Sequence, residues 1–318
     1  MTAFGAESTT DEVLDGLDLT GTNVVVTGAS AGLGVETVRA VAAHGATVVG
    51  IARDTAKAEK ALAEAGAEGD IQVREADLAS FASIRSFTDA FLADGLDRID
   101  VLINNAGIMA CPQGATADGF ELQFGTNHLG HFLLTNRLLP LLRTGPPARI
   151  VNLSSAGHQF GPTDPDDPNF ESTPYDPWLA YGRSKTANIL FAVELDRRLG
   201  ASGVRATAIH PGGIHTELGR HLTEEAIATL IKARAARSGG GDGTPAWKSV
   251  QQGASTSVWT GFVADADTIG GRYCEDCSVS PVVEAPTMPG VMSYAVDADA
   301  AARLWAASER YVGETFDG

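Results

Sequence analysis

From residue 20 to about residue 210, short apolar runs rich in β-branched residues alternate with longer Ala-rich stretches that carry apolar residues at helical spacing. Near-continuous apolar runs are typical of strands buried on both faces, and the intervening stretches are long enough for crossover helices. The alternation therefore predicts an α/β fold with a doubly wound parallel sheet. We expect its strands at Asn23–Thr27, Thr47–Ile51, Ile71–Arg74, Ile99–Ile103, Arg149–Leu153 and Val204–Ile209.

Two segments interrupt the alternation. His158–Pro177 is rich in Pro, Asp and Gly and predicts a long loop, and Ser238–Pro245 predicts a flexible connection. The helical pattern of Thr223–Ala236 lies between them and, hinged at Ser238–Gly243, is expected to close over bound molecules. The pattern of Asp297–Val312 predicts a final helix.

No long linker separates a second core, so a single domain is expected. We expect an N-terminal extension at residues 1–19 and one α/β domain over residues 20–318. Segments of about 217–250 and 273–296 are expected to form a small C-terminal substrate cap.

Charge and cysteine content narrow the function. The 318 residues contain 23 Lys and Arg against 40 Asp and Glu, a formal net charge of −17. A surface this acidic repels phosphate backbones and anionic lipids, which disfavours nucleic acid and membranes as partners. Three cysteines are too few for a disulfide framework, the first residues do not resemble a signal peptide, and no apolar run approaches a membrane span. A soluble, cytoplasmic protein that acts on a small molecule is expected.

A glycine-rich turn, TGASAGLG at residues 27–34, follows the first predicted strand and precedes a helical run. Glycines let the backbone bend sharply and approach a pyrophosphate, while the helix N-terminus supplies N–H groups and the positive end of a dipole. Glycines also serve plain tight turns. The position of this turn between the first strand and the first helix favours a dinucleotide site in a single Rossmann-like domain.

Residues Gly28–Gly32 also match G-x-S-x-G, the nucleophile elbow of serine hydrolases, with Ser30 as the nucleophile. That elbow follows a central strand, and an earlier loop supplies part of its oxyanion hole. Only about twenty residues precede the first strand here, so nothing upstream can supply that donor. A hydrolase is the weaker alternative.

Tyr181 and Lys185 lie four residues apart in the helical pattern of Trp178–Leu199, and therefore share one helix face. A phenol with a pKa of about 10 is a poor acid or base at neutral pH. A neighbouring ammonium group favours the phenolate, so Lys185 is expected to lower the pKa of Tyr181. A surface aromatic beside a solvated lysine would show the same spacing, and the surrounding motifs decide between the two.

Those motifs resemble the short-chain dehydrogenase/reductase family over residues of about 20–220. They are TGASAGLG (27–34), NNAG (104–107), Asn127 in NHLGHF, Ser155 in NLSSAGH, YGRSK (181–185) and HPGGIHT (210–216). NHLGHF and LSSAGH are most similar to the retinol dehydrogenase and WW-domain oxidoreductase branch. The resemblance implies an NADP- or NAD-dependent alcohol dehydrogenase or ketone reductase that acts on a fairly apolar secondary alcohol or carbonyl compound.

The same resemblance implies the catalytic roles. Tyr181 would exchange a proton with the substrate oxygen, and Lys185 would hold the nicotinamide ribose and lower the pKa of Tyr181. Ser155 would hydrogen-bond the substrate carbonyl, with the adjacent Ser154 as the alternative. Asn127 would distort its helix and position a water in the proton relay. A non-catalytic dinucleotide-binding sensor could dispense with these residues, so their presence counts against that competing function.

The resemblance also implies the cofactor contacts. Asn105–Gly107 would line the adenosine ribose, Asp77 would reach the adenine amino group, and Pro211–Thr216 would flank the nicotinamide. Many relatives assemble through their long helices, so a homo-oligomer, a dimer or a tetramer, is expected. The expected cofactor-binding residues are Gly28, Ser30, Ala31, Gly32, Leu33, Gly34, Arg53, Asp77, Leu78, Asn105, Ala106, Gly107, Tyr181, Lys185, Pro211, Gly212, Ile214 and Thr216.

The end of the second strand bears on the choice of nicotinamide. Ala52 stands where an acidic residue would bond the ribose hydroxyls of NAD, and Arg53 can hold the additional phosphate of NADP. Asp54 is expected to cap the next helix. Ala31 provides no second basic residue in the glycine turn. NADP is favoured over NAD.

The cysteines, the histidines and the aromatic residues give weaker indications of function. Cys274 and Cys277 form C-x-x-C without a second pair, so packing is favoured over a metal site, and no metal is expected. The histidines show no regular metal spacing, and a contact of His215 with substrate is only a guess. Some of the aromatic residues in or near the irregular segments are expected to line an apolar pocket: Phe160, Phe170, Tyr175, Trp178 and Trp247.

Overall fold

The structure is a computed structural model that describes residues 4–144, 147–219, 222 and 247–316. Within these residues the main sheet has eight strands in the order β3-β2-β1-β4-β5-β6-β7-β8, parallel except for β8 at the edge. The predicted doubly wound sheet is confirmed, and the six predicted strands agree with β1–β6 to within two residues. The main strands are β1 (Asn23–Thr27), β2 (Thr47–Ala52), β3 (Asp70–Glu75), β4 (Val101–Asn104), β5 (Arg149–Leu153), β6 (Arg205–His210), β7 (Tyr273–Glu275) and β8 (Ser278–Val279).

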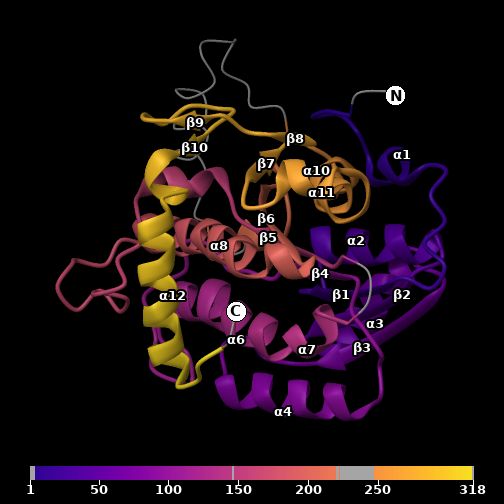
Figure 1. Cartoon of the computed structure of the whole chain (residues 1–318), viewed down its shortest axis with the longest axis horizontal. Helices are drawn as coiled ribbons and strands as arrows, with labels where there is room; N and C mark the ends of the chain where they lie inside the picture. Colours follow the sequence, from indigo (N-terminus) through magenta and orange to yellow (C-terminus); the bar gives the residue numbers. More distant parts are fainter. Residues whose placement is uncertain (1–3, 145–146, 220–221, 223–246, 317–318) are drawn as a thin grey trace.

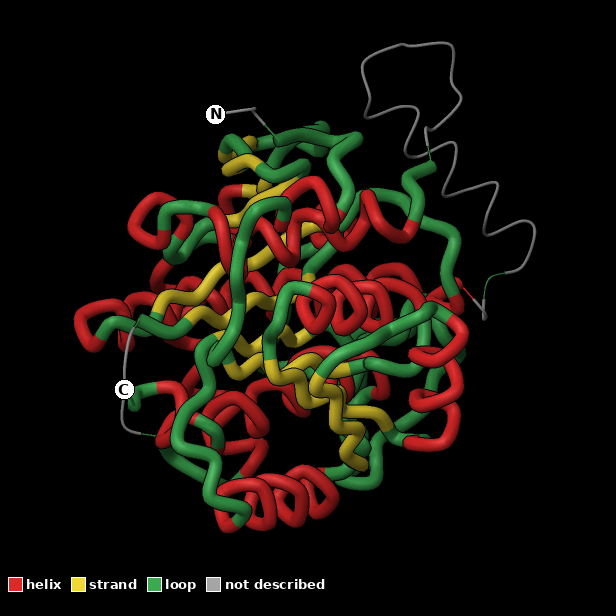
Figure 2. The backbone as a smooth tube through the Cα atoms, turned by 90° about the vertical axis from the view of Figure 1, so that its right-hand side faces the viewer, coloured by secondary structure: helices red, strands yellow, loops and turns green. Residues whose placement is uncertain are grey.

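Helices cover both faces of this sheet (Figures 1 and 2). The longer helices are α2 (Gly32–Ala43), α3 (Thr55–Glu64), α4 (Phe81–Ala93), α6 (Gly130–Arg137), α8 (Pro177–Leu199), α10 (Val250–Val258) and α12 (Ala298–Val312). The short ones are α1 (Thr10–Leu14), α5 (Leu122–Phe124), α7 (Leu139–Leu142) and α11 (Ala266–Ile269). Two π turns occupy Gly125–Leu129 and Trp259–Val263, and 3-10 turns occupy Ala156–Phe160, Gly200–Ser202, Glu217–Gly219 and Ser293–Ala295.

The two faces of the sheet belong to two separate apolar clusters. Val25 of β1 faces the cluster that includes Phe132 of α6 and Trp305 of α12. Val24 and Val26 face the opposite cluster, which includes Val38 of α2. Alternate residues of one strand therefore pack against different helical layers, which explains why the predicted strands are apolar without interruption.

The helix ends follow local chemistry. Asp176 caps α8 by accepting a hydrogen bond from the Leu179 N–H, and Pro177 occupies the first helical position, where its missing N–H is not needed. Asp297 caps α12 in the same way, and Gly313 ends that helix with a left-handed φ of +70°. The predicted final helix is confirmed.

The C-terminal third departs in part from the expected cap. β7 and β8 extend the main sheet, although they lie in the segment expected to cover the substrate. β9 (Val282–Val283) and β10 (Val291–Met292) form a separate two-stranded sheet, and the loop between them brings Met288 to the cavity described below. The expected lid helix and its hinge, residues 223–236 and 238–243, lie outside the described residues.

Candidate active site

A cavity of about 1050 Å³ lies along the carboxyl ends of β1, β2, β4, β5 and β6. In a doubly wound sheet this edge is the usual place for a ligand, because the loops diverge there. The expected site residues on its wall are Gly28, Ser30, Ala31, Gly32, Leu33, Arg53, Asp77, Leu78, Asn105, Ala106, Gly107, Ser155, Tyr181, Lys185, Pro211, Gly212, Ile214 and Thr216. Gly34 and Asn127 lie behind the wall.

The glycine turn brings the backbone close to its neighbours. Gly28 has a left-handed φ of +76°, and a Cβ there would lie 2.9 Å from the Cα of Ala106. A Cβ on Gly34 would lie 2.2 Å from the carbonyl oxygen of Gly28, so Gly34 serves the close approach of α2 to the turn. Among the residues that the structure describes, no side chain caps the N-terminus of α2 at Ala31, and Gly32 and Leu33 line the cavity. This open helix end and the glycine cradle fit the pyrophosphate of a dinucleotide.

Two basic residues stand near the end of β2. Arg53 lines the cavity, and Asp54 caps α3 by accepting a hydrogen bond from the Lys57 N–H at 2.9 Å, as predicted. Lys57 also lines the cavity, and its Nζ lies 2.5 Å from Oε2 of Glu217, another lining residue. The sequence analysis missed Lys57. Its place in the first turn of the helix that follows Arg53 and the Asp54 cap is the signal that could have found it.

The floor of the cavity is held by strand-end hydrogen bonds. Asn105 Nδ2 donates to the Thr27 carbonyl at 2.7 Å, and the Ala106 N–H donates to Thr27 Oγ1 at 3.0 Å. Asp77 accepts from the Ala79 N–H at 3.0 Å and faces the cavity. Ser80, and not Asp77, caps the following helix α4.

Asn127 lies in the π turn Gly125–Leu129 and is fully buried. Its Oδ1 accepts from the Ile108 N–H at 2.9 Å, and its Nδ2 donates to the Ile108 carbonyl at 2.9 Å and to Ser184 Oγ at 3.0 Å. Ser184 donates in turn to the Tyr181 carbonyl at 2.8 Å. Asn127 therefore connects the loop after β4 with the helix that carries Tyr181 and Lys185.

The two adjacent serines have different surroundings. Ser154 Oγ donates to the Lys185 carbonyl at 2.8 Å, so its hydroxyl is engaged with the backbone of α8. Ser155 Oγ accepts from the Gly157 N–H at 3.0 Å and hydrogen-bonds the Tyr181 side chain. Of the two hydroxyls, that of Ser155 is the one beside the phenol.

Tyr181 and Lys185 are both buried on the cavity wall, with Lys185 Nζ 5.7 Å from the centre of the Tyr181 ring. Burial raises the pKa of Tyr181 to about 12, against the lowering effect of the Ser155 hydrogen bond. Burial lowers the pKa of Lys185 to about 8. The expected lowering of the phenol pKa by Lys185 is not found in this ligand-free site, where burial dominates and keeps Tyr181 protonated at neutral pH.

A glycine missed by the sequence analysis sets the position of the phenol. A Cβ on Gly157 would lie 2.7 Å and 2.9 Å from two carbons of the Tyr181 ring. A real side chain cannot approach that closely, so only glycine lets the ring lie against this turn. Gly157 is part of the NLSSAGH motif, but the need for glycine at this position is visible only when α8 packs against the turn.

The loop after β6 is supported from the C-terminal part of the chain. The Lys248 N–H donates to the Gly213 carbonyl at 2.9 Å, and Lys248 Nζ lies 2.5 Å from Oδ1 of Asp276. The aliphatic part of Lys248 packs on Gly212, where a Cβ would lie 2.8 Å from its Cδ. Residues far apart in sequence therefore fix the Pro211–Thr216 segment.

Apolar side chains surround the remaining part of the cavity. Phe160 and Trp178 meet edge to face at 5.7 Å, and the rings of His215 and Trp247 lie 3.8 Å apart. Phe170 and Tyr175, by contrast, pack on each other away from the cavity, with ring centres 5.2 Å apart. Met109, Leu218, Leu222 and Met288 complete this apolar mouth.

Cys274 and Cys277 are buried thiols, and burial raises the pKa of both. In the described ranges no three His, Cys, Asp or Glu side chains gather as a metal site would require. Among the same residues no helix combines the length and apolar character needed to cross a bilayer.

Comparisons with known proteins agree with this geometry. A family model described as "short chain dehydrogenase" matches residues 22–227. The human protein named retinol dehydrogenase 14 is 41% identical over 312 residues, which cover 92% of this chain and 87% of that protein.

Solved structures show the same arrangement of elements. A crystal structure of an uncharacterized protein from Mycobacterium paratuberculosis has a TM-score of 0.72 and 38% identity, covering 96% of this chain and 98% of that chain. A complex of Pseudomonas aeruginosa RhlG with NADP has a TM-score of 0.63 and 26% identity, covering 81% of this chain and 95% of that chain.

Proposed function

This chain belongs to the short-chain dehydrogenase family, and we propose that it uses NADP(H), acts on an apolar substrate and has Tyr181 as its proton donor and acceptor. As a member of this family it is an oxidoreductase that moves a hydride between a nicotinamide cofactor and an alcohol or carbonyl substrate. One observation carries the catalytic part of the proposal. The buried, protonated Tyr181 shares a cavity wall with Ser155, Lys185 and the glycine turn.

A nicotinamide cofactor held in this cavity would supply the hydride chemistry for reduction of a carbonyl compound. The Tyr181 hydroxyl donates its proton to the substrate oxygen as negative charge develops there. Ser155 hydrogen-bonds the same oxygen, which stabilises that charge. The Lys185 ammonium stabilises the phenolate that remains and would hold the nicotinamide ribose. Since Tyr181 is protonated at neutral pH, the ligand-free site is prepared for carbonyl reduction.

We assign Asn127 to positioning within this mechanism, because its side chain lies behind the wall. Its hydrogen bonds to the backbone of Ile108 and to Ser184 connect the loop after β4 with the α8 turn that carries Tyr181 and Lys185. The other expected contacts, including Gly28, Asp77, Asn105, Pro211 and Thr216, are proposed to hold the dinucleotide.

The preference for NADP rests on charge at the end of β2. Arg53 lines the cavity there, whereas Lys57 is paired with Glu217, and Ala52 places no carboxylate at the end of the strand that would repel a phosphate. The relative RhlG binds NADP in its crystal structure. Together these observations favour NADP over NAD for this chain.

The cofactor preference is tested by charge reversal. Arg53→Glu is expected to lower kcat/KM for NADPH by about tenfold or more, because a charge-assisted contact to phosphate is lost and replaced by repulsion. The value for NADH should change little. Arg143→Glu, an exposed residue outside the cavity wall, is the control. An equal effect of Arg53→Glu on both cofactors would contradict the assignment.

The apolar mouth favours an apolar alcohol or carbonyl compound, and the 41% identity to retinol dehydrogenase 14 makes retinoids the first class to test. Cofactor absorbance should be followed with NADPH and NADH against panels of retinoids, steroid ketones and small polar ketones. Turnover of the apolar panels with NADPH is expected. Tight cofactor binding without turnover of any panel member would favour the sensor function instead.

Assembly is a separate proposal. A homo-oligomer through long helices is expected from the family resemblance, but the apolar face of α8 packs against α12 and the sheet of its own chain. We therefore propose that subunits meet through another surface. A solution mass of one chain by light scattering would contradict any oligomer.

A further inference from the structure

His131 of α6 is buried and makes a hydrogen bond through each ring nitrogen. Nδ1 lies 2.9 Å from the Asn127 carbonyl oxygen, and Nε2 lies 2.9 Å from Thr27 Oγ1. Asn127 belongs to the π turn, whereas Thr27 ends β1 directly before the glycine turn. One side chain therefore touches both the catalytic and the cofactor-binding parts of the site.

The chemistry of these atoms fixes the direction of each hydrogen bond. A carbonyl oxygen can only accept, so Nδ1 of His131 carries the proton and donates to Asn127. In a neutral ring Nε2 then accepts, and the Thr27 hydroxyl donates to it. Thr27 Oγ1 accepts in turn from the Ala106 N–H at 3.0 Å. The three hydrogen bonds that link Ala106, Thr27, His131 and Asn127 can therefore run in only one direction, each donor being fixed.

The surroundings hold the ring in this neutral form. Burial lowers the pKa of His131 to about 4, and the nearby Lys185 charge acts in the same direction against the hydrogen bond to Asn127. The ring thus keeps one donor and one acceptor throughout the neutral range of pH.

We propose that His131 is a positioning residue that fixes the Asn127 carbonyl and, through Thr27, ties the π turn beside Lys185 to the Ala106 segment of the cofactor cavity. The proposal rests on the function proposed above. Losing the contact to Asn127 should affect kcat, because it loosens the support of α8. Losing the contact to Thr27 should affect cofactor binding, because it frees the Ala106 backbone.

The chain itself suggests a variant that separates these two effects. Asn136, in the same helix, donates from Nδ2 to the carbonyl four residues earlier, that of Phe132, at 2.8 Å. His131→Asn can make the same contact to Asn127 but is too short to reach Thr27. His131→Phe loses both contacts while it keeps most of the buried volume.

The experiment measures kcat with an active ketone, the Kd for NADPH alone by fluorescence, and Tm. His131→Phe is expected to lower kcat and to raise the Kd, each by about tenfold, the effect of one or two lost hydrogen bonds. His131→Asn should recover kcat to within about threefold of the unmodified enzyme while its Kd stays raised. Asn136→Leu removes an equivalent contact away from the cavity and is expected to change Tm only.

The proposal is overturned if His131→Phe resembles Asn136→Leu in kcat and Kd, or if His131→Asn leaves kcat as low as His131→Phe does. If His131→Phe does not fold, His131→Asn alone tests the proposal, which requires a nearly normal kcat together with a raised Kd for NADPH. An unchanged Kd in His131→Asn would then overturn the proposal. Tyr181→Phe is measured in parallel. Full turnover by Tyr181→Phe would refute the proposed function, whereas its inactivity together with a silent His131→Phe would refute only this inference.

Discussion

Tyr181 and Lys185 show how burial sets the protonation of a reactive pair. Burial keeps the Tyr181 phenol protonated, and it lowers the pKa of the Lys185 ammonium group to about 8. Lys185 Nζ donates to the Leu153 carbonyl at 3.0 Å, which compensates part of the desolvation. The arrangement is costly for stability and, in the proposed mechanism, serves proton transfer.

Lys185→Met is therefore expected to stabilise the cofactor-free protein at pH 7 by roughly 1–3 kcal/mol in the free energy of unfolding, while abolishing turnover. The Leu153 carbonyl still accepts from Asn188 Nδ2 at 2.9 Å in this variant. The folded pKa of Lys185 lies below the unfolded value of about 10.5. Above pH 8 the unfolded state binds more protons, so the unmodified protein gains stability as pH rises.

Urea unfolding at several pH values measures this difference. The advantage of Lys185→Met should be complete below pH 8 and should vanish as pH approaches about 10.5. A variant less stable than the unmodified protein at pH 7 would show that Lys185 is not a destabilising buried charge.

Gly157 gives a second prediction at the residue scale. Gly157→Ala places a methyl group against the Tyr181 ring and is expected to lower kcat by about tenfold or more, since a small displacement of a reacting group has a large effect. Gly114→Ala, whose Cβ would meet its nearest atom at 3.6 Å, is the control. A normal kcat in Gly157→Ala would mean that the ring position is not critical.

At the scale of elements, the long segment before α8 has an organising residue. Its beginning and end place Phe160 and Trp178 on the cavity wall. Asp167 accepts hydrogen bonds from the N–H groups of Glu171, Ser172 and Thr173 at 2.7 Å, 3.1 Å and 3.0 Å. These bonds fold the loop around one carboxylate.

Asp167→Asn should loosen this loop, because an amide has one accepting oxygen where the carboxylate has two. We expect faster proteolytic cleavage within 161–176 and a raised KM for apolar substrates, with an unchanged Kd for NADPH. Asp166→Asn, exposed beside it, is the matched control. Equal cleavage rates in both variants would contradict the role of Asp167.

The pH dependence follows from the same contacts. The hydrogen bonds hold the pKa of Asp167 well below its usual value, so its stabilising contribution is present above about pH 4 and is lost as pH falls further. Loop cleavage in the unmodified protein should therefore increase below pH 4, measured with an acid-active protease, while Asp167→Asn should show a smaller change.

The prediction from sequence succeeded where the signal was local. β1 and β5 agree exactly with their apolar runs, and the glycine turn and Tyr181 are recognisable by spacing. β7 to β10 are only two or three residues long, so no periodicity can develop, and their pairing is set by distant strands. Gly157 and His131 were missed for a related reason, because their roles depend on helices brought together by folding.

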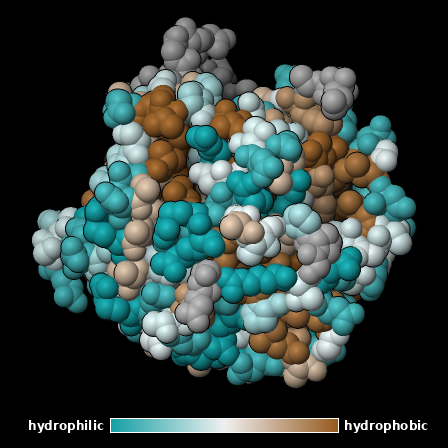
Figure 3. Space-filling view, in the orientation of Figure 1, coloured by the Kyte–Doolittle hydropathy of each residue, from teal (hydrophilic) through white to brown (hydrophobic). Residues whose placement is uncertain are grey.

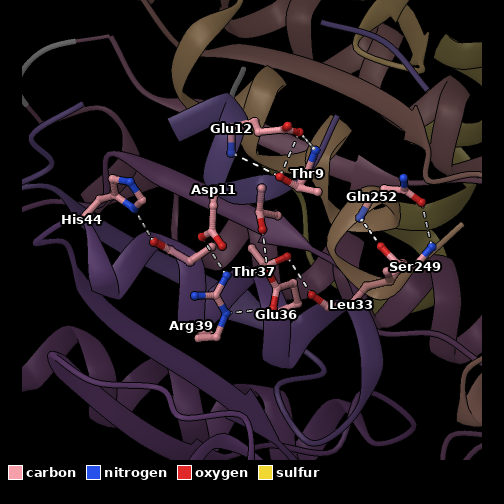
Figure 4. A network of polar contacts seen from close by, with 12 residues as sticks. Thr9, Asp11, Glu12, Leu33, Glu36, Thr37, Arg39, His44, Ser249 and Gln252 are labelled. Atoms are coloured by element: carbon pink, nitrogen blue, oxygen red, sulfur yellow. Dashed lines mark hydrogen bonds and ion pairs between the residues drawn. The ribbon is translucent and has the colours of Figure 1, made fainter. Parts of the chain in front are cut away.

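At the scale of the whole molecule, the N-terminal segment is part of the packed structure. Val13 and Leu14 of α1 are buried against the layer of α2 and α10. Figure 4 shows Arg39 of α2 between Asp11 and Glu36, at 2.8 Å and 2.7 Å. Residues expected as a mere extension thus support the helix that begins at the glycine turn.

Leu14→Ala is expected to lower the free energy of unfolding by roughly 2 kcal/mol or more, because it leaves a cavity at a fully buried position. Leu17→Ala, at a residue that is 37% exposed, should have little effect. Equal urea midpoints for the two variants would show that α1 is not integral to the fold.

The C-terminal helix α12 packs on the sheet face opposite to the layer of α2 and α10. α12 lies across α8 and contributes Leu304 and Trp305 to the cluster that contains Phe132 (Figure 1). The surface of the molecule shows little exposed core material. On the face in Figure 3, hydrophobic residues form separate patches among hydrophilic ones. Among the described residues the large hydrophobic side chains that remain exposed are Leu17 and Val282.

The most direct test of the central claim is the rate of carbonyl reduction by Tyr181→Phe, followed by NADPH absorbance with an active substrate. Phe keeps the ring and removes only the proton donor, so kcat should fall by a factor of about a hundred or more while NADPH still binds. Tyr175→Phe, whose hydroxyl bonds the Cys111 carbonyl outside the cavity wall, should retain kcat. Turnover by Tyr181→Phe at the rate of the unmodified enzyme would contradict the mechanism.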